Sequence, residues 1–194
     1  MSRVTRSRWR FPLRDQIIIA LVAAMIVAAK FYFRVPLKIP GHSGIFWMAL
    51  LVIGTGVVRR PGAGTLIGLI SGILATLIVP GRLGIFAGVK YFVPGVVVDL
   101  LGLALGGRLD RTIVAVIVAA MANVAKLAAS YMMGLAAGVP PGYLALGLGL
   151  AATTHVLFGG LGGLVAAVVL RRLDRTGVMP PAAALRTEEA TGAV

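Results

Sequence analysis

The stretch IIIALVAAMIVAAK, residues 17–30, has no polar side chain before its final lysine. Within it Ala20, Ala24 and Ala28 recur at every fourth position, so in a helix they would share one face. Small side chains at this spacing let a second helix approach closely inside a membrane. The stretch therefore predicts a membrane-spanning helix with a small-residue face, which would pack on a partner protein or on another helix of the same chain.

The rest of the chain has the same apolar character. Of its 194 residues 59% are hydrophobic and only 13% are charged, and the mean hydropathy is +0.98. Soluble domains are about half apolar and about a quarter charged. A chain of this size cannot bury so many apolar side chains in its own core, so we predict an all-α integral membrane protein. The absence of cysteine excludes disulfides, thiolate nucleophiles and cysteine metal sites.

The apolar residues fall into separate runs of helical length. A spanning helix needs roughly 20 mostly apolar residues, and such runs occupy residues 16–33, 44–58, 63–80, 85–106, 112–137 and 143–170. The last run is long and rich in glycine, which favours a tilt or a break. We therefore expect six transmembrane helices in a membrane domain of residues 15–172. No cleavage pattern follows the first run, so we expect it to be retained.

The positive charge lies between the apolar runs. The net charge is +13, and its arginines cluster in short connecting segments, a pattern that orients membrane proteins and argues against nucleic acid as a partner. With the N-terminus in the cytoplasm, the opposite side keeps only Arg34, Lys38 and Arg82 in its loops. We therefore expect both termini to be cytoplasmic. Residues 1–14 form a basic cytoplasmic N-terminus, and the Pro/Ala-rich residues 173–194 are predicted to be a disordered cytoplasmic tail.

The connection RVPLKIPGHSG, residues 34–44, is the one elaborate loop on the predicted outer face. Several basic residues are expected on the same side of the membrane as this loop, and no acidic residue is expected on that side. This distribution of charge indicates a pocket for an anionic ligand. Contact with lipid headgroups is the alternative, and Lys30 and Lys90 could simply reach the membrane surface. Trp47 could anchor at the interface, and Ser43 could cap the following helix. The candidate substrate contacts are Arg34, Lys38, His42, Ser43, Trp47 and Lys90.

Two ionisable residues lie deeper in the apolar runs. Asp99 is toward the inner half of the fourth run, and Lys126 is near the middle of the fifth. Charges at membrane depth are costly and usually pair or serve a function. We expect a structural ion pair between them, with a functional role as the alternative.

Together these features resemble the substrate-binding S component of energy-coupling factor (ECF) vitamin transporters. The resemblance covers about residues 15–172 and includes YFVPGVVVDLLGLALGG, residues 91–107, the alanine face of the first helix and the long outer loop. It implies a non-enzymatic protein of a prokaryotic cell membrane that captures a small molecule, such as a vitamin, from outside, with residues 34–44 as the gate. It also implies docking through Ala20, Ala24 and Ala28 to a transmembrane coupling subunit driven by two cytoplasmic ATPases. No cofactor is expected, and no G-x-x-x-x-G-K-[ST] phosphate loop occurs in the chain.

Three alternatives remain from the sequence. GHSG at residues 41–44, with His155 in a later run, is similar to the serine motif and histidine of rhomboid intramembrane proteases. The serine follows only one span, however, and the histidine and asparagine of an early rhomboid helix are absent. A non-catalytic scaffold like the rod-shape morphogenesis membrane proteins would share the architecture. A metal-ion S component would use His42, but without an outer carboxylate its ligand set is thin, so we expect no metal site.

Overall fold

The computed structural model describes residues 11–32, 42–78 and 86–177, which form helices and turns without a strand. The helices are α1 (Leu13–Tyr32), α2 (Gly44–Val58), α3 (Ala63–Ile78), α4 (Phe86–Ala104), α5 (Thr112–Ala136), the short α6 (Pro141–Ala145) and α7 (Leu148–Arg175). The all-α prediction is confirmed, and the six long helices coincide with the six apolar runs. Several predicted features lie wholly or mostly outside the described residues. They are Arg34, Lys38, Arg82, the predicted gate up to residue 41 and both terminal segments.

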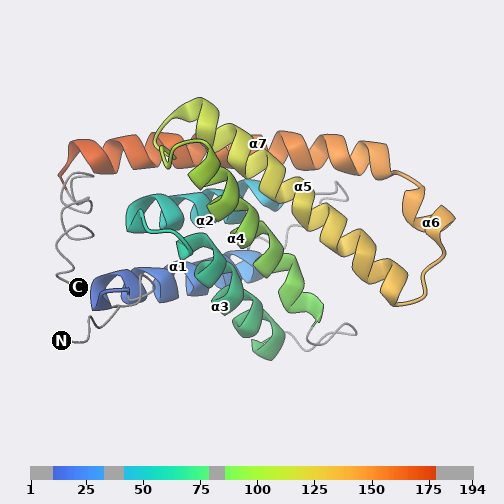
Figure 1. Cartoon of the computed structure of the whole chain (residues 1–194). Coiled ribbons are helices and arrows are strands. Elements are labelled where there is room, and N and C mark those ends of the chain that lie inside the picture. The colour runs from blue at the N-terminus through green and yellow to red at the C-terminus, as the bar shows by residue number, and fades with distance from the viewer. Residues whose placement is uncertain (1–10, 33–41, 79–85, 178–194) are drawn as a thin grey trace, which may run out of the picture.

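The last apolar run is broken. Helix α6 ends at Ala145 and α7 begins at Leu148, with Gly147 between them at φ 77°. Glycine adopts this left-handed conformation at little cost because it has no Cβ. As a result α6 lies between the end of α5 and the start of α7, at the right of Figure 1. Helix α7 then runs back along the length of the molecule.

Glycines bring helices α3 and α4 into backbone contact. A Cβ on Gly68 would lie 2.5 Å from the carbonyl oxygen of Tyr91, and one on Gly72 would lie 2.8 Å from that of Gly88. Only residues without side chains permit such an approach, which is the usual means of close helix packing in membranes. The position of Tyr91 is thereby tied to α3.

The helices enclose a small core and leave large apolar side chains facing outward. Met48, Val52 and Ile67 are fully buried, whereas Leu77 is 73% and Ile113 is 75% exposed. Similar exposed residues occur along α1, α4 and α7. An apolar surface this extensive suits lipid rather than water, and α5 and α7 are each long and apolar enough to cross a membrane by length and composition.

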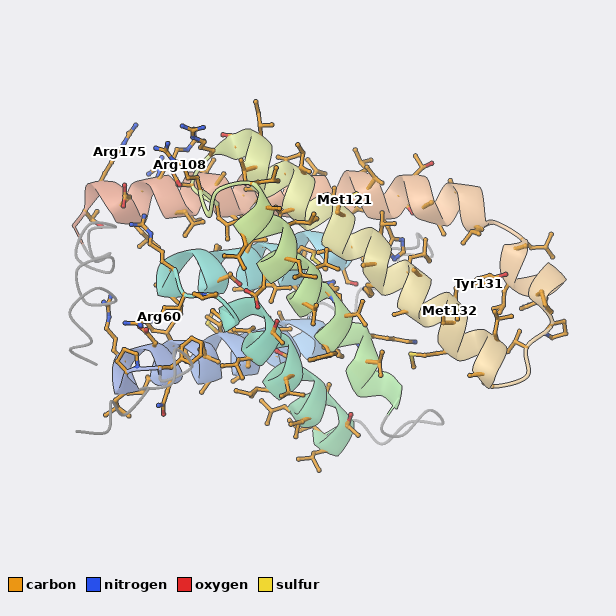
Figure 2. The ribbon with its side chains drawn as sticks, in the orientation of Figure 1. Arg60, Arg108, Met121, Tyr131, Met132 and Arg175 are labelled. Atoms are coloured by element: carbon orange, nitrogen blue, oxygen red, sulfur yellow. The ribbon has the colours of Figure 1, made fainter. Side chains whose placement is uncertain are left out.

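Arginines and two ion pairs gather at one end of the described helices. At one end, Arg59 pairs with Asp174 and Arg60 pairs with Asp15, each at 2.9 Å, so the turn between α2 and α3 is tied to the beginning of α1 and the end of α7. Figure 2 shows Arg60, Arg108 and Arg175 toward this end and Tyr131 toward the other. The starts of α1 and α5 and the end of α7 lie at the same end in Figure 1. We call it the arginine end.

Candidate functional site

A partly enclosed cavity lies away from the arginine end, where α1 finishes and α2 begins. It has a volume of about 40 Å³. Residues of α1, α2, α4 and α5, with Ser43 just before α2, form its walls: Ala29, Lys30, Ser43, Phe46, Trp47, Lys90, Tyr91 and Lys126. Three of these carry ammonium groups and none is acidic. Pockets for whole drug-sized ligands span about 300–1,000 Å³, so this cavity has room for one small group.

Two of the three lysines lie over aromatic rings. The rings of Trp47 and Tyr91 pack edge to face, with centroids 5.9 Å apart and planes at 62°. The Nζ of Lys126 lies 4.7 Å from the Trp47 centroid, and the Nζ of Lys30 lies 4.7 Å from the Tyr91 centroid. An ammonium over an aromatic face is stabilised by about 0.5–2 kcal/mol, depending on its hydration. One chain of contacts therefore links α1, α4, α2 and α5.

The same two aromatic residues carry buried polar atoms without a partner. In the described part of the chain, neither Trp47 Nε1 nor the Tyr91 hydroxyl makes a hydrogen bond, although the residues are only 7% and 6% exposed. Unsatisfied buried donors are costly and uncommon. The cavity wall itself carries the lysines and Ser43 and no carboxylate. Its chemistry suits a ligand that accepts hydrogen bonds and carries negative charge.

The predicted contacts are found at this cavity in part. Ser43, Trp47 and Lys90 line it, whereas the half-buried His42 does not, and Arg34 and Lys38 lie outside the described residues. Ser43 occupies the position before α2, but its side chain makes no capping hydrogen bond.

Sequence reasoning did not name Tyr91 or Lys126 as substrate contacts, and it placed Lys30 in the outer basic group without adding it to the candidate contacts. The available signal was the set of lysines within apolar runs, together with the tyrosine that directly follows Lys90.

Asp99 and Lys126 do not form the expected ion pair, because they lie at different depths. Lys126 is about 21 Å along α5 from Thr112, whereas Asp99 is only about 8 Å from the end of α4 that joins it. The Asp99 carboxylate instead accepts hydrogen bonds from the backbone N–H groups of Gly64 at 2.9 Å and Thr65 at 2.7 Å, and from the Thr65 hydroxyl at 2.6 Å. It stabilises the first turn of α3, where a negative charge is favourable.

The serine and histidine of the protease alternative are not joined. The Nδ1 of His155 lies 2.7 Å from the carbonyl oxygen of Ala151, and Asn123 Nδ2 donates to the carbonyl oxygen of His155 at 2.8 Å. No hydrogen bond between Ser43 and His155 occurs among the described residues. Those residues also contain no group of three His, Cys, Asp or Glu side chains able to hold a metal ion.

The alanine face of α1 points away from the core. Ala20, Ala24 and Ala28 are all exposed, whereas the neighbouring Ala23 and Ile26 point inward and are 0% and 1% exposed. Ala28 also borders an open apolar groove of about 510 Å³ between α1, α2 and α7. The described helices therefore leave this small-residue face uncovered.

Comparisons with known proteins agree with this architecture. No protein-family model matches the chain, and a search of curated proteins finds no similar sequence. Among solved structures, a protein described as an S-component of an ECF transporter superposes with a TM-score of 0.59 and 21% sequence identity. The alignment covers 95% of this chain and 98% of the other. The chain thus has an S-component-like fold, as the sequence resemblance indicated.

Proposed function

We propose that this protein is the substrate-capture subunit of an ECF-type importer and binds a small, anionic, vitamin-like molecule from the outside. The observation that carries the proposal is the cavity whose wall combines three lysines, three aromatic residues and no acidic residue. The S-component-like fold supports the same assignment. The protein itself would hydrolyse nothing.

The proposed placement has six membrane-spanning helices and both termini in the cytoplasm of a prokaryote. The arginine end would face the cytoplasm, because arginines near helix ends resist translocation. The cavity would then lie in the outer half, since Lys30 is near the last turn of α1 and Ser43 directly precedes α2. A ligand would reach it from outside without crossing the core.

Capture would rest on charge and preorganisation. Lys30, Lys90 and Lys126 would bind the anionic group, while Trp47 and Tyr91 hold two of these lysines in place. We propose that the segment 34–44, which contains Arg34, Lys38 and His42, closes over the bound molecule.

Delivery would require partners. We propose that Ala20, Ala24 and Ala28 dock against a transmembrane coupling subunit, which two cytoplasmic ATPases drive. The exposed alanines support this role because small side chains allow close contact with a partner helix. Membrane lipid would cover this face while the subunit is alone.

The capture function can be tested without ATP or partners. The purified full-length protein is expected to retain a small molecule, which mass spectrometry of the denatured sample would identify. Lys90→Gln should release it, whereas Arg108→Gln, which removes one exposed charge outside the cavity, should not. Repeated failure to find any retained molecule would count against capture and favour the scaffold.

A further inference from the structure

We infer that the arginine end carries a binding site for an anionic phospholipid of the phosphatidylglycerol class, at the junction between the start of α5 and the end of α7. This junction lies away from the cavity, so the inference goes beyond capture and does not depend on it. The ligand is a lipid of the surrounding membrane and not the captured molecule.

The outward face of α7 changes from apolar to basic along its length. Leu161, Leu164 and Val168 are exposed, and the exposed residues that continue this face on the last turns are Arg171, Arg172 and Arg175. Residues three and four positions apart share one face of a helix, so these six side chains form a single stripe. The stripe matches the build of a phospholipid, in which acyl chains lie next to a charged phosphate.

Helix α5 has a similar arrangement. Ile113, Ile117 and Met121 are exposed along it, and the exposed Arg108 and Arg111 precede its first residue. Figure 2 shows Arg108 at the arginine end and Met121 further along α5. A second apolar stripe therefore ends in arginines at the same end of the molecule.

The packing of α5 on α7 brings the two groups of arginines to similar heights. The helices run in opposite directions (Figure 1), and a Cβ on Gly163 would meet the carbonyl oxygen of Ala115. Arg111 is one turn from Ala115 toward the arginine end, and Arg171 is two turns from Gly163 in the same direction. Their heights therefore differ by about 6 Å, or one turn. Long side chains from both helices can reach one phosphate group.

Positive charge is in excess at this junction. Within residues 11–32, 42–78 and 86–177, none of the five arginines on α7 and before α5 makes an ion pair. The carboxylates of Asp15 and Asp174 are paired with other arginines, and Asp110 is left as the carboxylate in the turn before α5. Guanidinium groups bind phosphate oxygens with paired hydrogen bonds. Basic residues at a membrane surface favour anionic over zwitterionic lipids.

The apolar stripes favour a lipid over a soluble phosphate as the ligand. A soluble phosphate would contact the arginines alone, whereas a phospholipid would also cover the exposed side chains of α5 and α7 that lead up to them. Burial of apolar surface adds to the electrostatic attraction. The acyl chains are therefore expected to be required for tight binding.

Native mass spectrometry can count the lipids that the full-length protein binds. The protein is freed of lipid in a non-ionic detergent and titrated with palmitoyl-oleoyl phosphatidylglycerol (POPG) or with the matched phosphatidylcholine (POPC), which has the same chains and no net charge. We expect POPG to bind saturably and at least about fivefold more tightly than POPC, the factor that one arginine at a headgroup supplies. Glycerol phosphate, which has no acyl chains, should not displace POPG.

Variants link the preference to the arginines. The double variant Arg171→Gln/Arg175→Gln should weaken POPG binding by more than tenfold, and Arg111→Gln on the other helix should weaken it about fivefold. Lys90→Gln, which removes a positive charge at the cavity, is the matched control and should bind POPG like the parent. Asp110→Asn should strengthen POPG binding, and this expected gain keeps the test valid if the double variant fails to fold.

Equal affinity for POPG and POPC would overturn the site, and so would equal losses in the arginine variants and in Lys90→Gln. Displacement of POPG by glycerol phosphate would assign the junction to a soluble phosphate instead. Arginine variants that bind POPG normally but no longer co-purify with the coupling subunit would show a protein surface and overturn the lipid site. Capture is tested separately, because POPG binding is expected whether or not the protein retains a small molecule.

Discussion

The ammonium group of Lys126 lies 4.7 Å from the centre of the Trp47 ring, so a lysine near the middle of α5 is held by an indole of α2. An aromatic face stabilises a cation without cancelling its charge. The carboxylate expected as partner, Asp99, is engaged at the first turn of α3 instead. The cavity therefore keeps a positive charge that a salt bridge would have neutralised, and this charge remains available to a ligand.

Replacing Trp47 should weaken anion binding even though an indole carries no charge. Trp47→Leu removes both the ring face under Lys126 and the edge contact with Tyr91. The expected loss of about 0.5–2 kcal/mol corresponds to roughly a 2- to 30-fold lower affinity for the molecule that the parent protein retains, measured by titration calorimetry. Phe92→Leu alters an aromatic residue of α4 that does not line the cavity and should change little. Equal effects of the two changes would contradict a specific role for Trp47.

Enlarging one side chain of the alanine face should abolish docking to the coupling subunit and leave ligand binding unchanged. Ala24→Leu adds bulk at an exposed position of α1, so the melting temperature and the amount of retained small molecule should stay near those of the parent. Co-purification with the coupling subunit should be lost, because the two helices can no longer approach closely.

Two other alanines serve as references for this experiment. Ala128→Leu, at an exposed position of α5, should preserve both stability and assembly. Ala23→Leu, at a fully buried position, should lower stability by about 1–3 kcal/mol through overpacking. An Ala24→Leu protein that still assembles would refute the docking face.

The Asp99 carboxylate should contribute to the stability of the fold and not to ligand binding. Asp99→Ala removes the acceptor of three hydrogen bonds at the start of α3 and leaves two backbone N–H groups unsatisfied. The expected loss is about 1–3 kcal/mol in the free energy of unfolding, measured by thermal denaturation in detergent. Asp110→Asn, near the α4–α5 turn, should cost less than about 0.5 kcal/mol. Loss of the retained small molecule from folded Asp99→Ala protein would show that the carboxylate serves the site after all.

Replacing Gly68 should alter the cavity by displacing the backbone at Tyr91. In Gly68→Ala the new methyl group would lie 2.5 Å from the carbonyl oxygen of Tyr91, so α3 and α4 must separate and Tyr91 must move. We expect a destabilisation of about 1–3 kcal/mol in thermal denaturation, together with weaker retention of the bound small molecule. Gly149→Ala, in α7 with open space around the added carbon, should be neutral or slightly stabilising. Normal binding by the Gly68 variant would mean that the glycine contact does not position Tyr91.

The site was partly predictable. Ser43, Trp47 and Lys90 were expected from their outer position among basic residues, and all three line the cavity. Lys126 was recognised as an unusual buried charge but assigned the wrong partner, because spacing along a helix gives no measure of how two helices face each other. The only signal for Tyr91 was its place directly after Lys90, and this signal is weak because aromatic residues are common in apolar helices.

The sequence by itself determined the all-helical class, the positions of the long helices and the accumulation of arginine at one end. These properties depend on the length and charge of local segments, which can be read without knowing any neighbour. Only the tertiary structure decided that Lys126 meets Trp47, that Asp99 serves α3, and that Ala20, Ala24 and Ala28 face outward. Each of these depends on the depth and rotation of a helix about its axis. Those are set by packing between helices, such as the glycine contact that joins α3 to the backbone of Tyr91.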